Sequence, residues 1–337
     1  MIFFICAFVF LLLILSFVFW LSSLLLYPPR QLLTRNPSNY GLDYEEVSFE
    51  STDHLALKGW LIPCSASAPV VILLHPQFGN RHGVDAHRKP WPGSFQTEVD
   101  LLKVAQAFHQ AGWAVLMFDF RSHGESQRGL CGGGMTEDQD VTGAVDYTFN
   151  RLVASLPEGE TPRVGVVGFG LGASAILAAV GRMKGKGEKL MVFTGDSEGG
   201  AGWTEIQPPN IKRLSFAILV QPVSLGSLLR GWLEDIMPAL SILIPFVDRL
   251  CQARGGYPLD GNLLLKAVRE VYLPVLIIQI RLDHWSASSE LQDLYEVLPG
   301  PKRIEWIEAP SGRLEVFRYL VDHPQALLDF AAQFMLK

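Results

Sequence analysis

The chain has 337 residues, of which 49% are hydrophobic and 18% are charged, and its formal net charge is -6 at pH 7. A chain of this length and composition can bury the core of one large domain. Because acidic residues outnumber basic ones, the chain offers no broad basic surface, which excludes nucleic acid as a partner.

The first segment has the composition of a membrane-spanning helix. Residues 2–26 contain no charged side chain, and about 20 apolar residues suffice to cross the ~30 Å hydrocarbon layer. A cleaved signal peptide is the alternative, but the segment lacks a basic start, is longer than a usual signal core and has no small-residue cleavage pattern before Tyr27. We therefore predict a single-pass anchor at 1–27, with membrane lipid as its partner. Arg30 and Arg35 follow it and favour a cytoplasmic location for the rest of the chain.

The remainder of the chain predicts a linker at 28–43 and one α/β domain at 44–337. Alternating apolar residues on either side of a turn predict two antiparallel strands within 44–63. Short apolar runs rich in β-branched residues then recur, as expected for strands buried on both faces, at 70–74, 114–118, 164–167, 216–220 and 275–280. Helical periodicity lies between several of them, at 97–110, 138–152 and 172–183. This alternation predicts a doubly wound, mostly parallel sheet.

Two segments do not fit this alternation. Residues 184–213 are rich in glycine and polar residues around one strand-like run, at 189–193. Residues 224–272 include an unusually apolar stretch at 236–247, and we interpret them as a small cap over the carboxyl edge of the sheet. The apolar stretch is either the buried core of that cap or a lid that contacts the membrane or an acyl chain.

Two motifs follow predicted strands. Residues 119–126 read Asp-Phe-Arg-Ser-His-Gly-Glu-Ser, and His75-Pro76 precedes Gly79-Asn80. The first resembles the D-x-R-G-H-G-x-S motif of the α/β-hydrolase superfamily, particularly its membrane-anchored esterase and acyl-peptidase-like members, and the second resembles the His-Gly turn after their third strand. The resemblance implies an α/β-hydrolase fold, and it implies structural roles near the site for His75, Asp119, Arg121 and His123.

The most informative motif is a glycine-rich turn between a predicted strand and a predicted helix, Gly168-Phe169-Gly170-Leu171-Gly172. It resembles the nucleophile elbow of the same family, G-x-S-x-G, with glycine in place of serine. The resemblance therefore implies that Gly170 occupies the nucleophile position and that the Leu171 N–H belongs to the oxyanion hole. The second oxyanion donor would be Gln77 or Phe78, because Pro76 replaces the family's glycine and has no N–H.

The resemblance also implies where the other two members of the catalytic triad should lie, since they follow the serine in the order acid, histidine. Asp283 comes directly after the predicted strand at 274–280 and matches the acid. Arg313 falls at the histidine position, in the turn after the predicted last strand at 302–310. His323 lies about ten residues later and resembles the start of the final helix. Two of the three triad positions are thus substituted.

The paired substitutions favour a catalytically impaired protein. A histidine base has little use once the hydroxyl that it deprotonates is gone, whereas glycine adopts the strained elbow turn readily. We expect such a protein to bind an acyl or ester ligand. The first alternative is an active hydrolase with another nucleophile; Ser174, one helical turn after Gly170, is a weak candidate because it should point along its helix.

The second alternative is nucleotide binding. Residues 168–173 also match G-x-G-x-x-A, and Asp196 lies near the spacing of a ribose-binding acid. This interpretation leaves the motif at 119–126 and the turn at Asp283 unexplained, so we favour the hydrolase fold. We expect neither a cofactor nor a metal, because the histidines near Asp85 match no strong zinc spacing.

Overall fold

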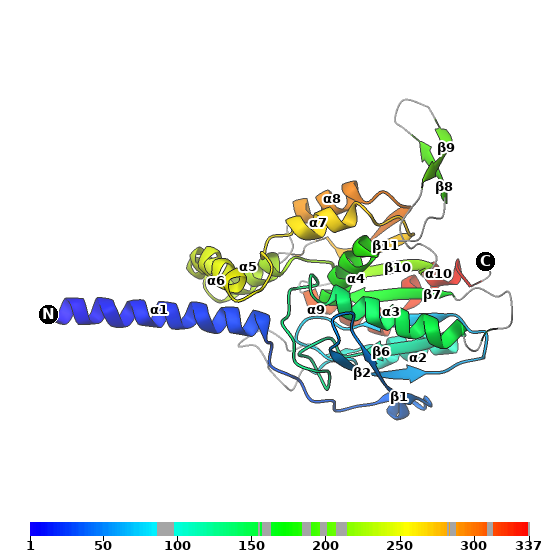
Figure 1. The fold of residues 1–337 in the computed structure, drawn as a ribbon, viewed down its shortest axis with the longest axis horizontal. Helices are drawn as coiled ribbons and strands as arrows, with labels where there is room; N and C mark the ends of the chain where they lie inside the picture. The colour runs from blue at the N-terminus through cyan, green and yellow to red at the C-terminus, as the bar shows by residue number, and fades with distance from the viewer. Residues whose placement is uncertain are drawn as a thin grey trace.

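The computed structural model describes residues 1–85, 98–153, 156, 163–183, 190–195, 201–206, 214–281, 283, 288–308 and 313–335. Its centre is one eight-stranded sheet in the order β1-β2-β6-β3-β7-β10-β11-β12 (Figure 1). The strands are β1 (Glu45–Glu50), β2 (Ala56–Ile62), β3 (Val70–Leu74), β6 (Ala114–Phe118), β7 (Val164–Phe169), β10 (Phe216–Val220), β11 (Val275–Ile280) and β12 (Lys302–Ile307).

Most of this sheet is parallel. In the sheet order, β6, β3, β7, β10, β11 and β12 each pair parallel to the next. By contrast, β2 is antiparallel to both β1 and β6. Every residue of β3, β6, β7, β10 and β11 is buried, as the continuous apolar runs predict. The prediction of a doubly wound, mostly parallel sheet is confirmed.

Helices cover both faces of the sheet. One face packs on α3 (Asp138–Val153), α4 (Leu171–Arg182), α7 (Asn262–Val268) and α8 (Ser288–Val297), and the other on α2 (Leu101–Gln110), α9 (Arg313–Asp322) and α10 (Gln325–Ala332). The central helix, α4, is buried over nearly its whole length. It is therefore held in place on several sides, which fixes the turn that leads into it from β7.

The segment at 184–213 does not extend the main sheet. Within its described residues, β8 (Leu190–Gly195) pairs antiparallel with β9 (Ala201–Ile206) in a separate two-stranded sheet (Figure 1). A second small sheet joins β4 (Gly83–Val84) to β5 (Val99–Asp100). The strand-like run expected near 189–193 is therefore β8, in a hairpin outside the α/β layers.

The predicted linker lies against the domain. Arg30 donates a hydrogen bond to the Ser126 carbonyl, and Arg35 forms an ion pair with Asp100, 2.7 Å away. The short 3₁₀ helix η1 (Pro37–Tyr40) follows. These contacts fix the path of the chain between the N-terminal helix and the sheet.

The N-terminal helix, α1 (Ile2–Leu26), is long and apolar enough to cross a membrane. Its first half projects from the body of the protein, and its second half lies beside the predicted cap (Figure 1). That region contains α5 (Leu225–Ile236), the 3₁₀ helix η3 (Pro238–Leu243), α6 (Ile244–Ala253) and α7. Val18, Leu21 and Leu25 of α1 are buried in one cluster with residues of α5 and α6.

A buried ion network joins the motif at 119–126 to the rest of the fold. The Arg121 guanidinium binds Asp140 of α3, with a closest distance of 2.7 Å, and also Asp53, 2.8 Å away. Although burial lowers the pKa of Arg121, its hydrogen bonds to Asp140 and Asp53 raise that pKa overall, so the group keeps its charge. The network ties the end of β6 to α3 and to the β1–β2 turn.

We expect Arg121→Ala to lower the free energy of unfolding by about 3–5 kcal/mol, because it leaves the Asp140 carboxylate buried without its cation. The control is Arg151→Ala, which removes an ion pair to Glu45 whose two side chains are 45% and 48% exposed; this change should cost less than about 1 kcal/mol. Urea unfolding of the full chain in detergent measures both. Equal losses in the two variants would contradict a structural role for Arg121.

Candidate functional site

The turn between β7 and α4 forms the centre of the candidate site. Gly170 has φ 53° and ψ -105°, a conformation that L side chains rarely adopt. Its N–H donates to the Val220 carbonyl at 2.8 Å, and its carbonyl accepts from the Ser174 N–H at 3.1 Å. A Cβ at Gly170 would lie 3.4 Å from the Phe317 ring and 3.7 Å from Pro76. The position therefore has room for a side chain that points into the site, but glycine supplies no nucleophile.

The glycines on either side of Gly170 permit close packing. A Cβ at Gly168 would lie 2.4 Å from the backbone of Gly172, and one at Gly172 would lie 2.8 Å from the backbone carbonyl of Leu74. Both contacts are too short for a real side chain. The pattern G-x-G-x-G at this turn thus follows from how tightly α4 lies against β3 and β7.

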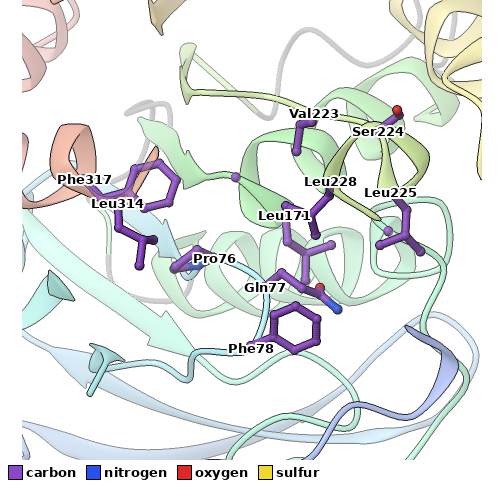
Figure 2. Close-up of a pocket in the computed structure, with 12 residues that line it drawn as sticks. Pro76, Gln77, Phe78, Leu171, Val223, Ser224, Leu225, Leu228, Leu314 and Phe317 are labelled. Carbon is purple, nitrogen blue, oxygen red and sulfur yellow. The ribbon is translucent and has the colours of Figure 1, made fainter. Parts of the chain in front are cut away.

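An apolar hollow covers Gly170. Counted with its open mouth, it has a volume of about 480 Å³. Figure 2 shows its walls, which come from the loop after β3, from the start of α5 and from α9. They comprise Pro76, Gln77, Phe78, Gly133, Gly170, Leu171, Val223, Ser224, Leu225, Leu228, Leu314 and Phe317. The composition suits a hydrocarbon group rather than a charged one.

Two backbone N–H groups are available at the edge of this hollow. Leu171 is the first residue of α4, so its N–H has no partner inside the helix. In the described part of the chain, neither the Leu171 nor the Gln77 N–H donates a hydrogen bond. The Gln77 side chain adds a buried amide whose nitrogen and oxygen have no partner among the described residues. This edge can therefore bind a carbonyl or carboxylate oxygen.

Asp283, which we predict at the acid position, follows β11 and is half-buried. Its Oδ2 atom lies 3.4 Å from the Gln221 amide nitrogen and 3.3 Å from that of Gln279. Gln221 comes directly after β10, and its backbone has φ 49°. The structure thus gives this carboxylate two amide contacts from neighbouring strands, which the sequence did not indicate.

The residue predicted at the histidine position lies at the start of α9. Arg313 is the first residue of that helix, and its side chain lies outside the described residues. One turn later, Phe317 packs edge-on against Phe169 with ring centroids 5.5 Å apart, and it borders the hollow. His323, at the other end of α9, is exposed and stacks on Tyr319. An aromatic ring therefore faces the elbow.

His75 and His123 have structural contacts. The His75 Nε2 atom accepts from the Phe120 N–H at 3.1 Å, which leaves Nδ1 to donate to the Pro76 carbonyl at 2.8 Å. The His123 Nδ1 atom lies 2.9 Å from the Arg121 carbonyl. Burial lowers the pKa of both imidazoles, and that of His75 lies well below its ordinary value. Both rings are therefore neutral at pH 7.

Asp119 has only structural contacts as well. Its fully buried carboxylate accepts hydrogen bonds from the Arg81 N–H at 2.7 Å, from the Arg81 guanidinium at 2.9 Å and from the Glu125 N–H at 2.9 Å. Asp119 thus orients the loops after β3 and β6, of which the first borders the hollow.

Ser174 does not reach the hollow. It is fully buried, its hydroxyl donates to the Val223 carbonyl at 2.8 Å and accepts from the Val223 N–H at 3.2 Å, and it thereby fixes the loop after β10. Ser224 does border the hollow, but its hydroxyl caps α5 by accepting from the Ser227 N–H. Sequence reasoning missed Ser224, as it missed Phe317, because neither lies in a motif.

The nucleotide-binding alternative is wrong in its strand arrangement. A dinucleotide site needs the next strand of the chain beside the first one, with the acid at its end. Here β7 lies between β3 and β10 in the main sheet, whereas the described residues of β8 pair with β9. Asp196 lies outside the described residues. Gly168 and Gly172 instead allow α4 to pack closely against the sheet.

We expect Gly170→Ala to lower the free energy of unfolding by about 1–3 kcal/mol, because φ 53° with ψ -105° strains any residue with a Cβ. Gly41→Ala is the control, since Gly41 has φ 69° and ψ 25° and open space around its Cβ position; its cost should be about 1 kcal/mol. Chemical unfolding compares them. A neutral or stabilising Gly170→Ala would contradict the strained turn.

The two buried histidines predict a loss of stability in acid. A histidine whose pKa is lower in the folded state binds fewer protons there than in the unfolded state. Its contribution to the free energy of unfolding therefore falls as the pH drops below the unfolded-state pKa of about 6.5. His123→Asn keeps a donor near Nδ1 and removes the titration. We expect the free energy of unfolding to fall less steeply between pH 6.5 and 5 in this variant, by up to about 1.4 kcal/mol per pH unit.

The carboxyl groups whose pKa is raised by burial, including Asp119 and Asp138, have the opposite effect on this pH dependence. They are present in both proteins, so the difference between the two slopes reports His123. Urea unfolding at several pH values measures it, and parallel slopes would show that His123 titrates alike in the folded and unfolded states.

Comparison with known proteins agrees with this geometry. The family model described as "Alpha/beta hydrolase family" matches residues 71–330. Among curated proteins, the uncharacterized protein YqkD of Bacillus subtilis is 27% identical over 203 residues, which are 60% of this chain and 57% of YqkD. The uncharacterized protein YfhR of Salmonella typhimurium is 28% identical over 162 residues, 47% of either chain. The chain thus spans about half the length of the curated relatives that it matches.

Solved structures of esterases and a peptidase share the fold. The Pyrococcus furiosus esterase Pf2001 superposes with a TM-score of 0.62 at 20% identity, over 92% of this chain and 97% of the esterase. The Pyrococcus horikoshii acylaminoacyl peptidase gives a TM-score of 0.55 at 16% identity, over 88% of this chain and 42% of the peptidase. The sheet order, the elbow turn before α4 and the family model over 71–330 lead to one conclusion: the chain belongs to the α/β-hydrolase family.

Proposed function

We propose that this protein is a membrane-anchored α/β-hydrolase-fold protein that binds an acyl or ester ligand over Gly170 and has lost serine-hydrolase chemistry. The observation that carries the proposal is the elbow itself, where glycine holds the nucleophile conformation and its Cβ position faces Phe317. Gly170 itself offers no hydroxyl that could form an acyl-enzyme bond.

The expected loss of turnover is large. Removing the nucleophile of a serine protease lowers turnover on the order of 10⁶-fold. The oxyanion hole and substrate binding alone still accelerate the reaction roughly 10³–10⁴-fold over its rate in water. The histidine position is also substituted, by Arg313. An arginine stays protonated near pH 7 and cannot act as the general base. What remains of the machinery therefore favours binding over turnover.

The retained parts of the site suit an acyl ligand. The Leu171 and Gln77 N–H groups can donate to a carbonyl or carboxylate oxygen, and the walls beside them are apolar. A ligand with one polar head and a hydrocarbon body would match both features. Leu225 and Leu228 of α5, which belongs to the cap, extend the apolar wall beside Leu171 (Figure 2).

The membrane anchor is the second part of the proposal. The helix α1 has 25 residues without a charge, and Arg30 and Arg35 follow it. These two arginines favour the cytoplasmic side for the domain. A cleaved signal sequence is the alternative, so the mass of the mature protein in membranes distinguishes the two.

Labelling with a fluorophosphonate and turnover of short-chain esters test the loss of chemistry. We expect the natural chain to remain unlabelled and the double variant Gly170→Ser/Arg313→His to be labelled, because it restores a nucleophile and a base on the existing frame. Adding Ser174→Ala to the double variant should leave the labelling unchanged, since Ser174 binds Val223 rather than facing the hollow. Labelling of the natural chain would overturn the proposal, and the labelled residue would identify the nucleophile.

A further inference from the structure

The cap carries an apolar surface with no cover in the described part of the protein. Residues 236–247 contain no charged side chain, between Asp235 and Asp248. They comprise the end of α5, η3 and the start of α6. Four large side chains of this segment are exposed: Ile236 by 49%, Met237 by 53%, Ile242 by 74% and Phe246 by 57%. An exposed apolar patch of this kind marks an interaction site.

The position of α1 beside this segment indicates what covers it. Val18, Leu21 and Leu25 of α1 are buried together with Trp232 of α5 and Val247 of α6. Trp20 also contacts Trp232, with ring centroids 6.4 Å apart. The cap therefore packs on the second half of the helix that we propose as the anchor (Figure 1).

The length of α1 places this contact at membrane depth. A hydrocarbon layer of ~30 Å takes about 20 helical residues, and α1 has 25. Any stretch of about 20 residues within Ile2–Leu26 includes residues 7–21, so it includes Val18 and Leu21. The parts of the cap that contact these residues then lie within the hydrocarbon layer, in the half nearest the domain.

One charged side chain marks the boundary. The Arg254 guanidinium donates to the hydroxyls of Ser22 and Ser23, at 2.6 and 2.9 Å, and lies 4.7 Å from the centre of the Phe19 ring. Arginine at the membrane interface keeps its charge in the polar layer while its stem lies in apolar surroundings. This places the edge of the hydrocarbon near Leu21.

We propose that residues 236–247 form a second membrane-embedded element, which inserts into the leaflet nearest the domain beside the end of α1. Its length suits an interfacial segment and is too short for a membrane span. The occupant of the exposed apolar surface is thus lipid hydrocarbon. Glu234 and Asp235 precede the segment and are exposed, so they stay in the headgroup layer at its rim. This inference rests on the proposed anchor.

Quenching by spin-labelled lipid tests the proposal in the full chain, reconstituted in phosphatidylcholine vesicles. The background carries Cys6→Ser and Cys64→Ser, because these two cysteines are exposed and Cys131 and Cys251 are buried. Ile242→Cys and Phe246→Cys each carry an environment-sensitive nitrobenzoxadiazole label. Two matched positions serve as controls: Leu11→Cys, 51% exposed on α1, and Tyr319→Cys, 43% exposed on α9.

We expect a mixture of lipids with doxyl groups on the upper and on the lower acyl chain to reduce the fluorescence at 242, 246 and 11 to roughly half, and to leave the label at 319 unchanged. Quenching at 11 alone would overturn the proposal and leave the anchor standing. Quenching at none of the positions would remove the anchor itself, and the inference with it. Equal quenching at 319 and 242 would also overturn the proposal, because contact with lipid would not be confined to the cap.

Discussion

The strand-to-helix turn at Gly170 is the constraint on which the site depends. The helix α4 is buried against β3 and β7, and the glycines at 168 and 172 allow the backbones to approach more closely than any Cβ would permit. A turn this tight forces the intervening residue into φ 53°. Its neighbours hold it there, since the Gly170 N–H donates to Val220 at the end of β10.

The same contacts connect the elbow to the acid position. Ser174 fixes the loop after β10 through Val223, and the next residue after β10, Gln221, donates backbone and side-chain hydrogen bonds toward β11 and Asp283. The elbow and the predicted acid position are thus joined by a network of hydrogen bonds between strand ends. Because that network depends on backbone groups and amides, its geometry does not require a serine side chain at the turn.

Sequence patterns predicted the part of this structure that depends on local periodicity and motifs. The buried runs at 70–74, 114–118 and 216–220 are β3, β6 and β10 with the same bounds. The motif at Gly170 predicted the turn, since its glycines are required by backbone contacts within a few residues. Phe317 and Gln221 could not be predicted in the same way. Each reaches the site through tertiary packing between elements that are far apart in sequence, and neither stands in a motif.

The N-terminal helix shows a different limit of sequence reasoning. A helix that is apolar on all sides carries no pattern that distinguishes a face in contact with lipid from a face in contact with protein. The sequence of α1 therefore indicates its length and leaves its burial against the cap undetermined. The folded chain resolves this, because Leu21 and Leu25 are fully buried while Phe3 and Phe10 are exposed.

Phe78 and Leu225 border the hollow over Gly170 and also belong to the apolar cluster around the end of α1. The helix is thus part of the wall behind the site, and replacing it with an unrelated apolar helix would alter the cavity.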